Sequence, residues 1–290
     1  MRDGRFSKTA RGAAAYRAIH QTLDHGAIFR DPLAARILDE KTTAALSEIA
    51  ADESLRAIRL FIAARSRFSE DTIANCVTRG VRQVVVLGAG LDTFSLRNPY
   101  GDLGVRVFEV DFPSTQVWKR ERIRRAGLLE PPSLIFAPID FEHESLAEGL
   151  TRVGFRQDQP AFFQWLGVVH YLTRDAVAST LEFISATSQA AVVFDYAEPF
   201  QNYPVERRAN VMAMAESAAA RGEPWLSLFD PAELLQLLRN VGLEDVEDLG
   251  LPELVERFYG ALSRDIKVGP GPHVVRACQH SGRANRVPSI

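Results

Sequence analysis

Two different spacings of hydrophobic residues divide the chain near residue 80. Before that point, apolar side chains recur every three or four positions, which is typical of amphipathic helices. Such stretches cover residues 13–23 and residues 43–77, and Gly80 ends the second of them. A short helix is also expected to begin at Asp31-Pro32, with proline at its first position. The spacing predicts that residues 1–80 form a helical N-terminal cover.

After residue 80, the apolar residues gather into short runs that are rich in β-branched side chains. Runs of this kind are typical of buried strands. They occur at residues 84–87, 105–110, 134–137, 161–166, 191–194 and 273–278. Helical patterns separate most of them, at residues 114–126, 145–153, 174–186 and 232–241. The alternation predicts an α/β fold with a doubly wound, mostly parallel sheet over residues 81–280.

One connection in this half is longer than an ordinary link between elements. Residues 198–229 lie between two sheet elements and contain a helical pattern at 204–220. We interpret them as an insertion over the edge of the sheet that forms a helical lid. Residues 281–290 follow the last strand without a periodic pattern, and we expect a flexible tail there.

Charge and cysteine content limit the expected partners. The 290 residues carry a formal net charge of −3, and the one dense basic run, from Lys119 to Arg125, is interpreted as a solvated helix face. Two distant cysteines indicate neither a disulfide framework nor a metal site. No apolar run reaches membrane-spanning length, and no signal core follows the first residues. We therefore expect a cytoplasmic protein without nucleic-acid or membrane partners, and its oligomeric state stays open.

Candidate chemistry lies in the loops after the strands, because doubly wound sheets bind ligands at the carboxyl ends of their strands. Gly88 and Gly90 follow the first strand, where glycines let the backbone turn tightly and approach a ligand. Thr93 stands at the third glycine position of a dinucleotide-binding loop, so the loop suits a cofactor without a pyrophosphate. Asp111 stands just past the second strand, where a carboxylate can accept both hydroxyls of a ribose, and for that reason it is preferred to Glu109.

Later loops add further candidates. After the third strand, Asp140 either accepts an adenine amino group, with Phe141 packed on the ring, or caps the next helix. After the fourth strand, His170 is a candidate general base beside Tyr171, although a lone histidine is more often structural. The residues expected to contact a substrate beyond the fifth strand are Tyr196, Glu198 and Tyr203.

The sequence VVVLGAGLDT at 84–93, followed by FEVDFP at 108–113, resembles the leucine carboxyl methyltransferase family. The segments AARSRF at 63–68 and GVVHYL at 167–172 match it as well, and the resemblance spans residues 7–260. The family includes the enzyme that esterifies the C-terminal leucine of a protein phosphatase, and bacterial members that methylate polyketide-type metabolites. The resemblance implies a seven-stranded, Rossmann-like methyltransferase sheet that binds S-adenosylmethionine.

The resemblance also assigns roles to single residues. Arg65 corresponds to the arginine that pairs with the carboxylate of S-adenosylmethionine, and Arg67 is the fallback. Family members commonly carry an acid just before Gly167, where this chain has Leu166, so the ammonium of the cofactor is expected to bind backbone carbonyls or another acid. The complete implied cofactor set is Arg65, Gly88, Gly90, Asp111, Asp140 and Phe141.

The expected function is S-adenosylmethionine-dependent O-methylation of a small organic, polyketide-like metabolite in secondary metabolism. The protein mainly has to align nucleophile, methyl carbon and sulfur. A carboxylate acceptor needs no base, whereas a phenol or hydroxyl acceptor would use His170 or Tyr171. Two alternatives stay open: a nicotinamide-dependent oxidoreductase, which gives Arg65 no role, and a catalytically inactive methyltransferase-like binding protein, which Leu166 leaves possible.

Overall fold

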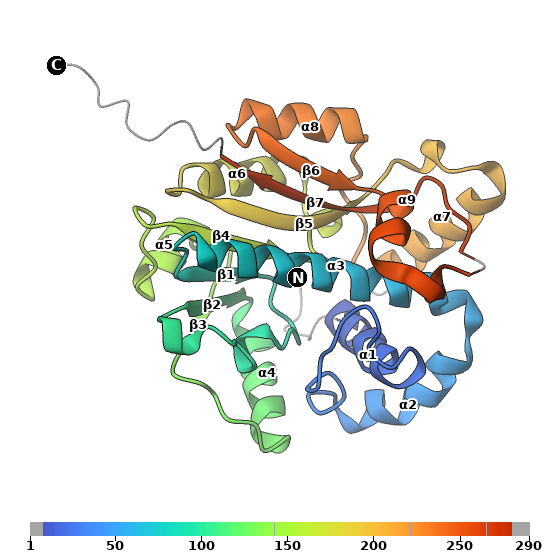
Figure 1. The fold of residues 1–290 in the computed structure, drawn as a ribbon, viewed down its shortest axis with the longest axis horizontal. Helices are drawn as coiled ribbons and strands as arrows, with labels where there is room; N and C mark the ends of the chain where they lie inside the picture. Colours follow the sequence, from blue (N-terminus) through green and yellow to red (C-terminus); the bar gives the residue numbers. More distant parts are fainter. Residues whose placement is uncertain (1–7, 142, 221, 265, 280–290) are drawn as a thin grey trace.

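The structure, a computed structural model, describes residues 8–141, 143–220, 222–264 and 266–279 (Figure 1). Its strands form a seven-stranded sheet in the order β3-β2-β1-β4-β5-β7-β6. Their bounds are β1 Gln83–Leu87, β2 Arg106–Asp111, β3 Leu134–Pro138, β4 Ala161–Trp165, β5 Ala191–Ala197, β6 Asp245–Leu249 and β7 Pro272–Cys278. Pairing is parallel from β3 through β5, and β7 is antiparallel to β5 and β6. The predicted doubly wound, mostly parallel sheet is confirmed.

Helices cover both faces of the sheet (Figure 1). Successive residues of a strand point to opposite faces, so Val84 and Val86 of β1 pack with α3, while Val85 and Leu87 pack with α5, α6 and α8. A third apolar cluster joins α1 to α4 through Trp118. The helix bounds are α1 Lys8–Leu23, α2 Glu40–Ala51, α3 Arg56–Thr78, α4 Pro113–Arg125, α5 Leu146–Arg152, α6 Arg174–Ser185, α7 Val205–Ala220, α8 Pro231–Asn240 and α9 Leu251–Leu254.

The single helical stretch expected over residues 43–77 is divided at Asp52. The backbone N–H of Asp52 bonds the carbonyl of Ile49 at the end of α2, and its side chain accepts from the N–H of Ser54. One residue therefore ends α2 and begins the short 3-10 turn that leads into α3. Apolar spacing continues across this break, so spacing alone does not reveal it.

The helix expected after Asp31 is absent, and residues 32–37 form turns instead. The Asp31 side chain is almost completely buried and binds Arg17 and Thr93 as well as the N–H of Leu33. Long-range contacts thus determine the path of the chain here. The predicted tail at 281–290 lies outside the described residues.

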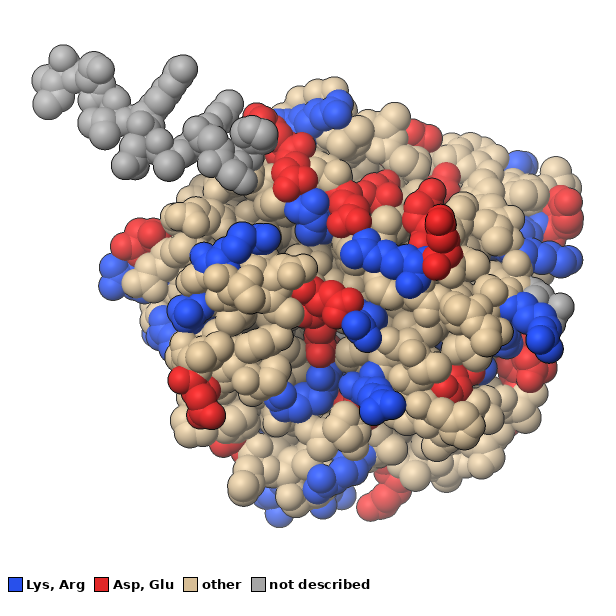
Figure 2. Space-filling view, viewed as in Figure 1, with Lys and Arg blue, Asp and Glu red and all other residues tan. Residues whose placement is uncertain are grey.

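The basic run on α4 is only partly the solvated face that we expected. Arg120, Arg124 and Arg125 are exposed and pair with nearby glutamates. Lys119, in contrast, is buried and lies 2.7 Å from the buried carboxylate of Glu109 on β2. Figure 2 shows acidic and basic side chains interspersed over the visible face of the molecule. Among the described helices, none is long and apolar enough to cross a membrane.

Candidate cofactor and active site

A cavity of about 420 Å³ opens at the carboxyl ends of β1, β2 and β4, where doubly wound sheets bind ligands. Its size lies within the range of small-molecule sites. Its walls come from α1, α3, the glycine loop after β1, the loop after β4 and the segment that follows α7. Of the predicted site residues, Arg65, Gly88, Gly90, Asp111 and Tyr171 line it together.

The glycine loop forms the floor of this cavity. Gly88 and Gly90 have φ angles of +65° and +45°, a region that glycine adopts readily and other residues avoid. A Cβ atom at Gly88 would lie 2.5 Å from the Val168 side chain, and one at Gly90 would lie 2.8 Å from Cβ of Ala10. Glycine is therefore required both for the turn and for the close approach of α1 and the β4 loop.

Asp111 closes the adjacent side of the cavity at the end of β2. Its two carboxylate oxygens accept the backbone N–H groups of Gly90 and Phe112, each at 2.7 Å. Burial raises the pKa of Asp111, and these two hydrogen bonds oppose that rise. A carboxylate has about four acceptor positions, so Asp111 retains capacity for hydroxyl groups of a ligand.

Arg65 of α3 also lines the cavity. Its Nη1 donates to Asp195 of β5 at 2.5 Å, and only about a tenth of its side chain is exposed. Its Nε is buried and has no hydrogen-bond partner among the described residues. A buried, unsatisfied donor on a cation fits an anionic ligand group, because leaving it unpaired is costly.

Arg67, the fallback for this role, points elsewhere. It is half-exposed on α3 and pairs with Asp71, one helical turn further along, at 2.8 Å. It is not among the residues that line the cavity. The structure therefore separates the two arginines, and Arg65 is the one that lines the cavity.

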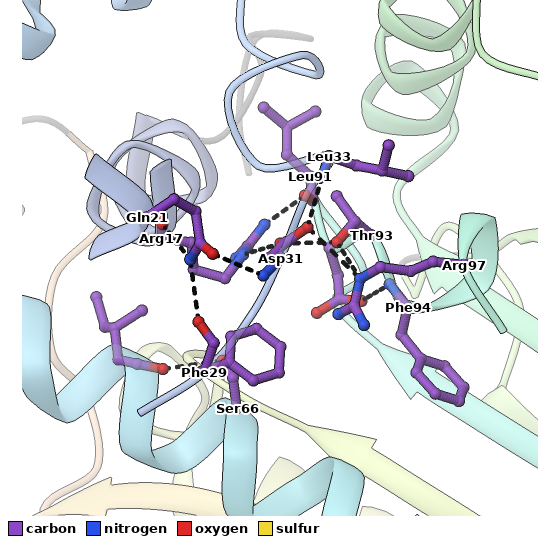
Figure 3. Close-up of polar contacts among 12 residues, drawn as sticks. Arg17, Gln21, Phe29, Asp31, Leu33, Ser66, Leu91, Thr93, Phe94 and Arg97 are labelled. Atoms are coloured by element: carbon purple, nitrogen blue, oxygen red, sulfur yellow. Dashed lines mark hydrogen bonds and ion pairs between the residues drawn. The ribbon is translucent and has the colours of Figure 1, made fainter. Parts of the chain in front are cut away.

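Figure 3 shows how α1 is joined to the glycine loop. Asp31 accepts from Nε of Arg17 at 3.1 Å and from the hydroxyl of Thr93 at 2.8 Å. Arg17 also donates to the carbonyl of Leu91, at 2.6 Å. Thr93, which departs from the dinucleotide-binding pattern, thus binds the N-terminal segment. Sequence reasoning missed Arg17 as a cavity residue, because it stands in an alanine-rich helix without a recognisable motif.

A further part of the cavity wall carries hydroxyl and carboxylate groups. Glu223, which follows α7, accepts from the hydroxyl of Thr9 at 2.5 Å and from its N–H at 3.2 Å. The same Thr9 hydroxyl lies 3.2 Å from the phenolic oxygen of Tyr171. Burial raises the pKa of Tyr171, so its phenol stays protonated near neutral pH. This part of the wall is where an acceptor can meet polar groups.

Comparison with known proteins agrees with this arrangement. The model of the family described as leucine carboxyl methyltransferase matches residues 10–185. YktD of Bacillus subtilis, which is named as an S-adenosyl-L-methionine-dependent methyltransferase, is 32% identical over 302 residues, covering 96% of this chain and 99% of its own. The chain belongs to the leucine carboxyl methyltransferase family. The predicted family and the predicted enzyme class are thereby confirmed.

Solved structures show the same fold. A methyltransferase from Thermobifida fusca superposes with a TM-score of 0.56 at 17% identity, covering 93% of this chain and 94% of its own. A DUF574 family protein from Streptomyces avermitilis gives a TM-score of 0.55 at 15% identity, covering 93% and 97%. At these identities, the likeness concerns the class I methyltransferase fold alone.

His170 is placed differently from its neighbour Tyr171 in this family member. The His170 ring packs 4.1 Å from the Tyr171 ring and 5.4 Å from that of Trp225, centroid to centroid. It does not line the cavity. Burial lowers the pKa of His170 to about 4, so the ring is neutral near pH 7. The structure therefore gives this candidate base a packing role.

Asp140 and Phe141 also lie outside the cavity lining. Phe141 is 63% exposed, and Asp140 lies 3.1 Å from Nδ1 of His143. The alternative role of Asp140 as a helix cap is not adopted, because Ser145 caps α5 in a capping box with Glu148. The adenine contact stays a prediction.

The three predicted substrate residues lie together in a buried polar cluster outside the cavity lining. The hydroxyl of Tyr196 donates to Asp248 at 2.6 Å, and Glu198 lies 3.3 Å from Nε2 of His273. Tyr203 is 3% exposed. Side chains alternate along β5, so Asp195 faces Arg65 while Tyr196 faces away from it. Substrate contact by these residues is not supported by this placement.

Proposed function

We propose that this protein transfers a methyl group from S-adenosylmethionine to an oxygen atom of a small organic metabolite, either a carboxylate or a phenol or hydroxyl. The single observation that carries the proposal is the convergence of the glycine loop, Asp111 and Arg65, whose Nε has no partner among the described residues, on one cavity. A nicotinamide enzyme has no evident use for a buried arginine in this position.

The cavity residues fit this cofactor by their chemistry. Arg65 would bind its carboxylate, the loop around Gly88 and Gly90 would pass beneath its methionine part, and Asp111 would accept its ribose hydroxyls. When bound, S-adenosylmethionine supplies a methyl group that its sulfonium already activates. Residues 1–80 act in this proposal as a cover, and residues 198–229 as a lid, since Thr9 and Glu223 both reach the cavity.

The polar cavity residues near Tyr171 would orient the acceptor. Tyr171 offers a hydroxyl that can donate to an acceptor oxygen, and it acts by hydrogen bonding because its phenol stays protonated. His170 lies outside the cavity, so a carboxylate acceptor would proceed without a base. For a phenol or hydroxyl acceptor, Glu223 is a carboxylate in position to accept its proton.

The test has a binding part and a turnover part. S-adenosylmethionine and S-adenosylhomocysteine should each raise the melting temperature, because they bind only the folded state, and NADH should not. A panel of small organic acids and phenols is then incubated with protein and S-adenosylmethionine, and products are followed by intact mass. Alkaline hydrolysis distinguishes a methyl ester from a methyl ether. Stabilisation by NADH alone would overturn the proposal.

A further inference from the structure

Three segments of the chain meet at Asp195. One of its oxygens accepts from Nη1 of Arg65 on α3, and the other accepts from the N–H of Gly167 after β4, both at 2.5 Å. Asp195 itself lies on the interior strand β5, and its side chain is 5% exposed. We call Arg65, Asp195 and Gly167 the arginine bracket.

The bracket fixes the guanidinium group from two directions. Asp195 engages Nη1, and the backbone of Gly167 lies directly against the flat group, where a Cβ atom would come within 3.0 Å of Nη2. Gly167 has a φ of +72°, which glycine alone adopts readily. The Nε atom remains without a partner among the described residues. The guanidinium is thus held through Nη1, while the buried Nε has no partner in the described part of the chain.

We propose that Asp195 is a positioning residue that holds Arg65, with its Nε unpartnered within the described ranges, in place for the carboxylate of the bound cofactor. Asp195 does not line the cavity, and its two oxygens accept from Arg65 and Gly167, so it acts through Arg65 rather than on the ligand. Arginine is flexible, and fixing it before binding removes part of the ordering cost from the binding step. This inference rests on the proposed function, because it requires a ligand with a carboxylate.

Two ligands separate positioning from general structural support. S-adenosylhomocysteine carries the amino-acid carboxylate, whereas 5′-methylthioadenosine shares the adenosine and the sulfur but lacks that carboxylate. Calorimetry of Asp195→Asn should show S-adenosylhomocysteine binding at least about tenfold more weakly than wild type. Binding of 5′-methylthioadenosine should stay within about twofold of wild type. In the Arg65→Met background, Asp195→Asn should produce no further loss.

A matched control lies on the same helix. Asp71→Asn removes the partner of Arg67 in an exposed pair, and it should leave both affinities unchanged. If Asp195→Asn does not fold, Asp195→Glu replaces it, since it keeps the charge but displaces it by one methylene. That variant should show the same selective loss for S-adenosylhomocysteine.

Three outcomes would overturn the inference. Unchanged affinity for S-adenosylhomocysteine would mean that Arg65 needs no positioning. Tighter binding would mean that Asp195 competes with the ligand carboxylate. Equal weakening of both ligands would assign Asp195 a structural role in the whole pocket. Wild-type protein that binds neither ligand would instead count against the proposed function, so the two failures are distinguishable.

Discussion

At the scale of single residues, Asp111 joins two parts of the cavity. It accepts the N–H of Gly90 and so fixes the glycine loop, and it also lines the cavity. We expect Asp111→Ala to weaken binding of S-adenosylhomocysteine by about 1.5–3 kcal/mol, the range for hydrogen bonds to a charged group. Calorimetry checks this, with the exposed Asp102→Ala as control. If Asp111→Ala bound S-adenosylhomocysteine as tightly as Asp102→Ala, the ribose would not be bound by Asp111.

Arg65 and Arg67 offer a comparison within one helix. Arg65→Lys keeps the charge but loses the planar set of donors that matches a carboxylate. We expect it to bind S-adenosylmethionine at least about tenfold more weakly, a loss of about 1.4 kcal/mol. Arg67→Lys changes an exposed pair and should bind normally. The opposite result, with the loss in Arg67→Lys, would transfer the role to the exposed arginine.

Single residues also show what the sequence reveals about the site. Motifs at strand ends led to Gly88, Gly90 and Asp111, because strand order fixes where those ends meet. Thr9 and Glu223 could not be found this way, since they reach the cavity from a cover and an insertion without shared motifs. His170 and Tyr171 are adjacent, and only the local 3-10 turn decides that the tyrosine faces the cavity.

At the scale of elements, the attachment of α1 to the glycine loop depends on Asp31. Its side chain is buried and accepts from Arg17 and Thr93 (Figure 3). We expect Asp31→Ala to lower the free energy of unfolding by about 3–5 kcal/mol, because it leaves Arg17 as a buried charge without its partner. It should also weaken cofactor binding, since Arg17 bonds the loop carbonyl of Leu91.

Urea unfolding with calorimetry checks this expectation. Asp158 provides the control, because it pairs with Arg156 and its side chain is 66% exposed. Asp158→Ala should change the free energy of unfolding by no more than about 1 kcal/mol. Similar losses in Asp31→Ala and Asp158→Ala would show that the buried network contributes little.

The elements that the sequence predicted are those with a strong apolar pattern. The buried parallel strands read as continuous apolar runs, and each was found. Strand β6 was missed, because it lies at the sheet edge and its sequence, DVEDL, is mostly acidic. Its carboxylates pair with Arg276 of β7 and Arg257, contacts that exist only in the folded chain. Contacts between residues far apart in the sequence therefore determine that residues 245–249 form a strand.

At the scale of the whole molecule, two half-buried histidines, His170 and His273, give the stability opposite dependences on pH. Burial lowers the pKa of His170 from 6.5 to about 4, so the unfolded chain binds more protons between these values. The free energy of unfolding is therefore not reduced by this group above pH 6.5. It falls by up to about 3 kcal/mol as the pH decreases toward 4. In urea unfolding, His170→Phe should lose less of its free energy of unfolding between pH 6.5 and 4 than wild type does. An equal loss in both proteins would exclude His170 as the source of this pH dependence.

His273 acts in the other direction. Burial alone would lower its pKa, but Asp248 of β6 and Glu198 after β5 flank the ring, with Tyr196 stacked on it, and the pKa is raised overall. A raised pKa means that the folded chain binds the extra proton. The stabilisation is therefore complete below pH 6.5 and is lost as pH rises through the folded value.

The corresponding variant, His273→Gln, removes the cation but keeps a polar side chain. We expect it to cost about 1.5–3 kcal/mol of unfolding free energy near pH 6, as for hydrogen bonds between charged groups, and progressively less at higher pH. Urea unfolding of wild type and variant from pH 6 to 9 measures the difference. His143→Gln serves as control, because the His143 side chain is 77% exposed. A difference that grows with pH would show that His273 is neutral in the folded protein, and that β6 and β7 are joined without its charge.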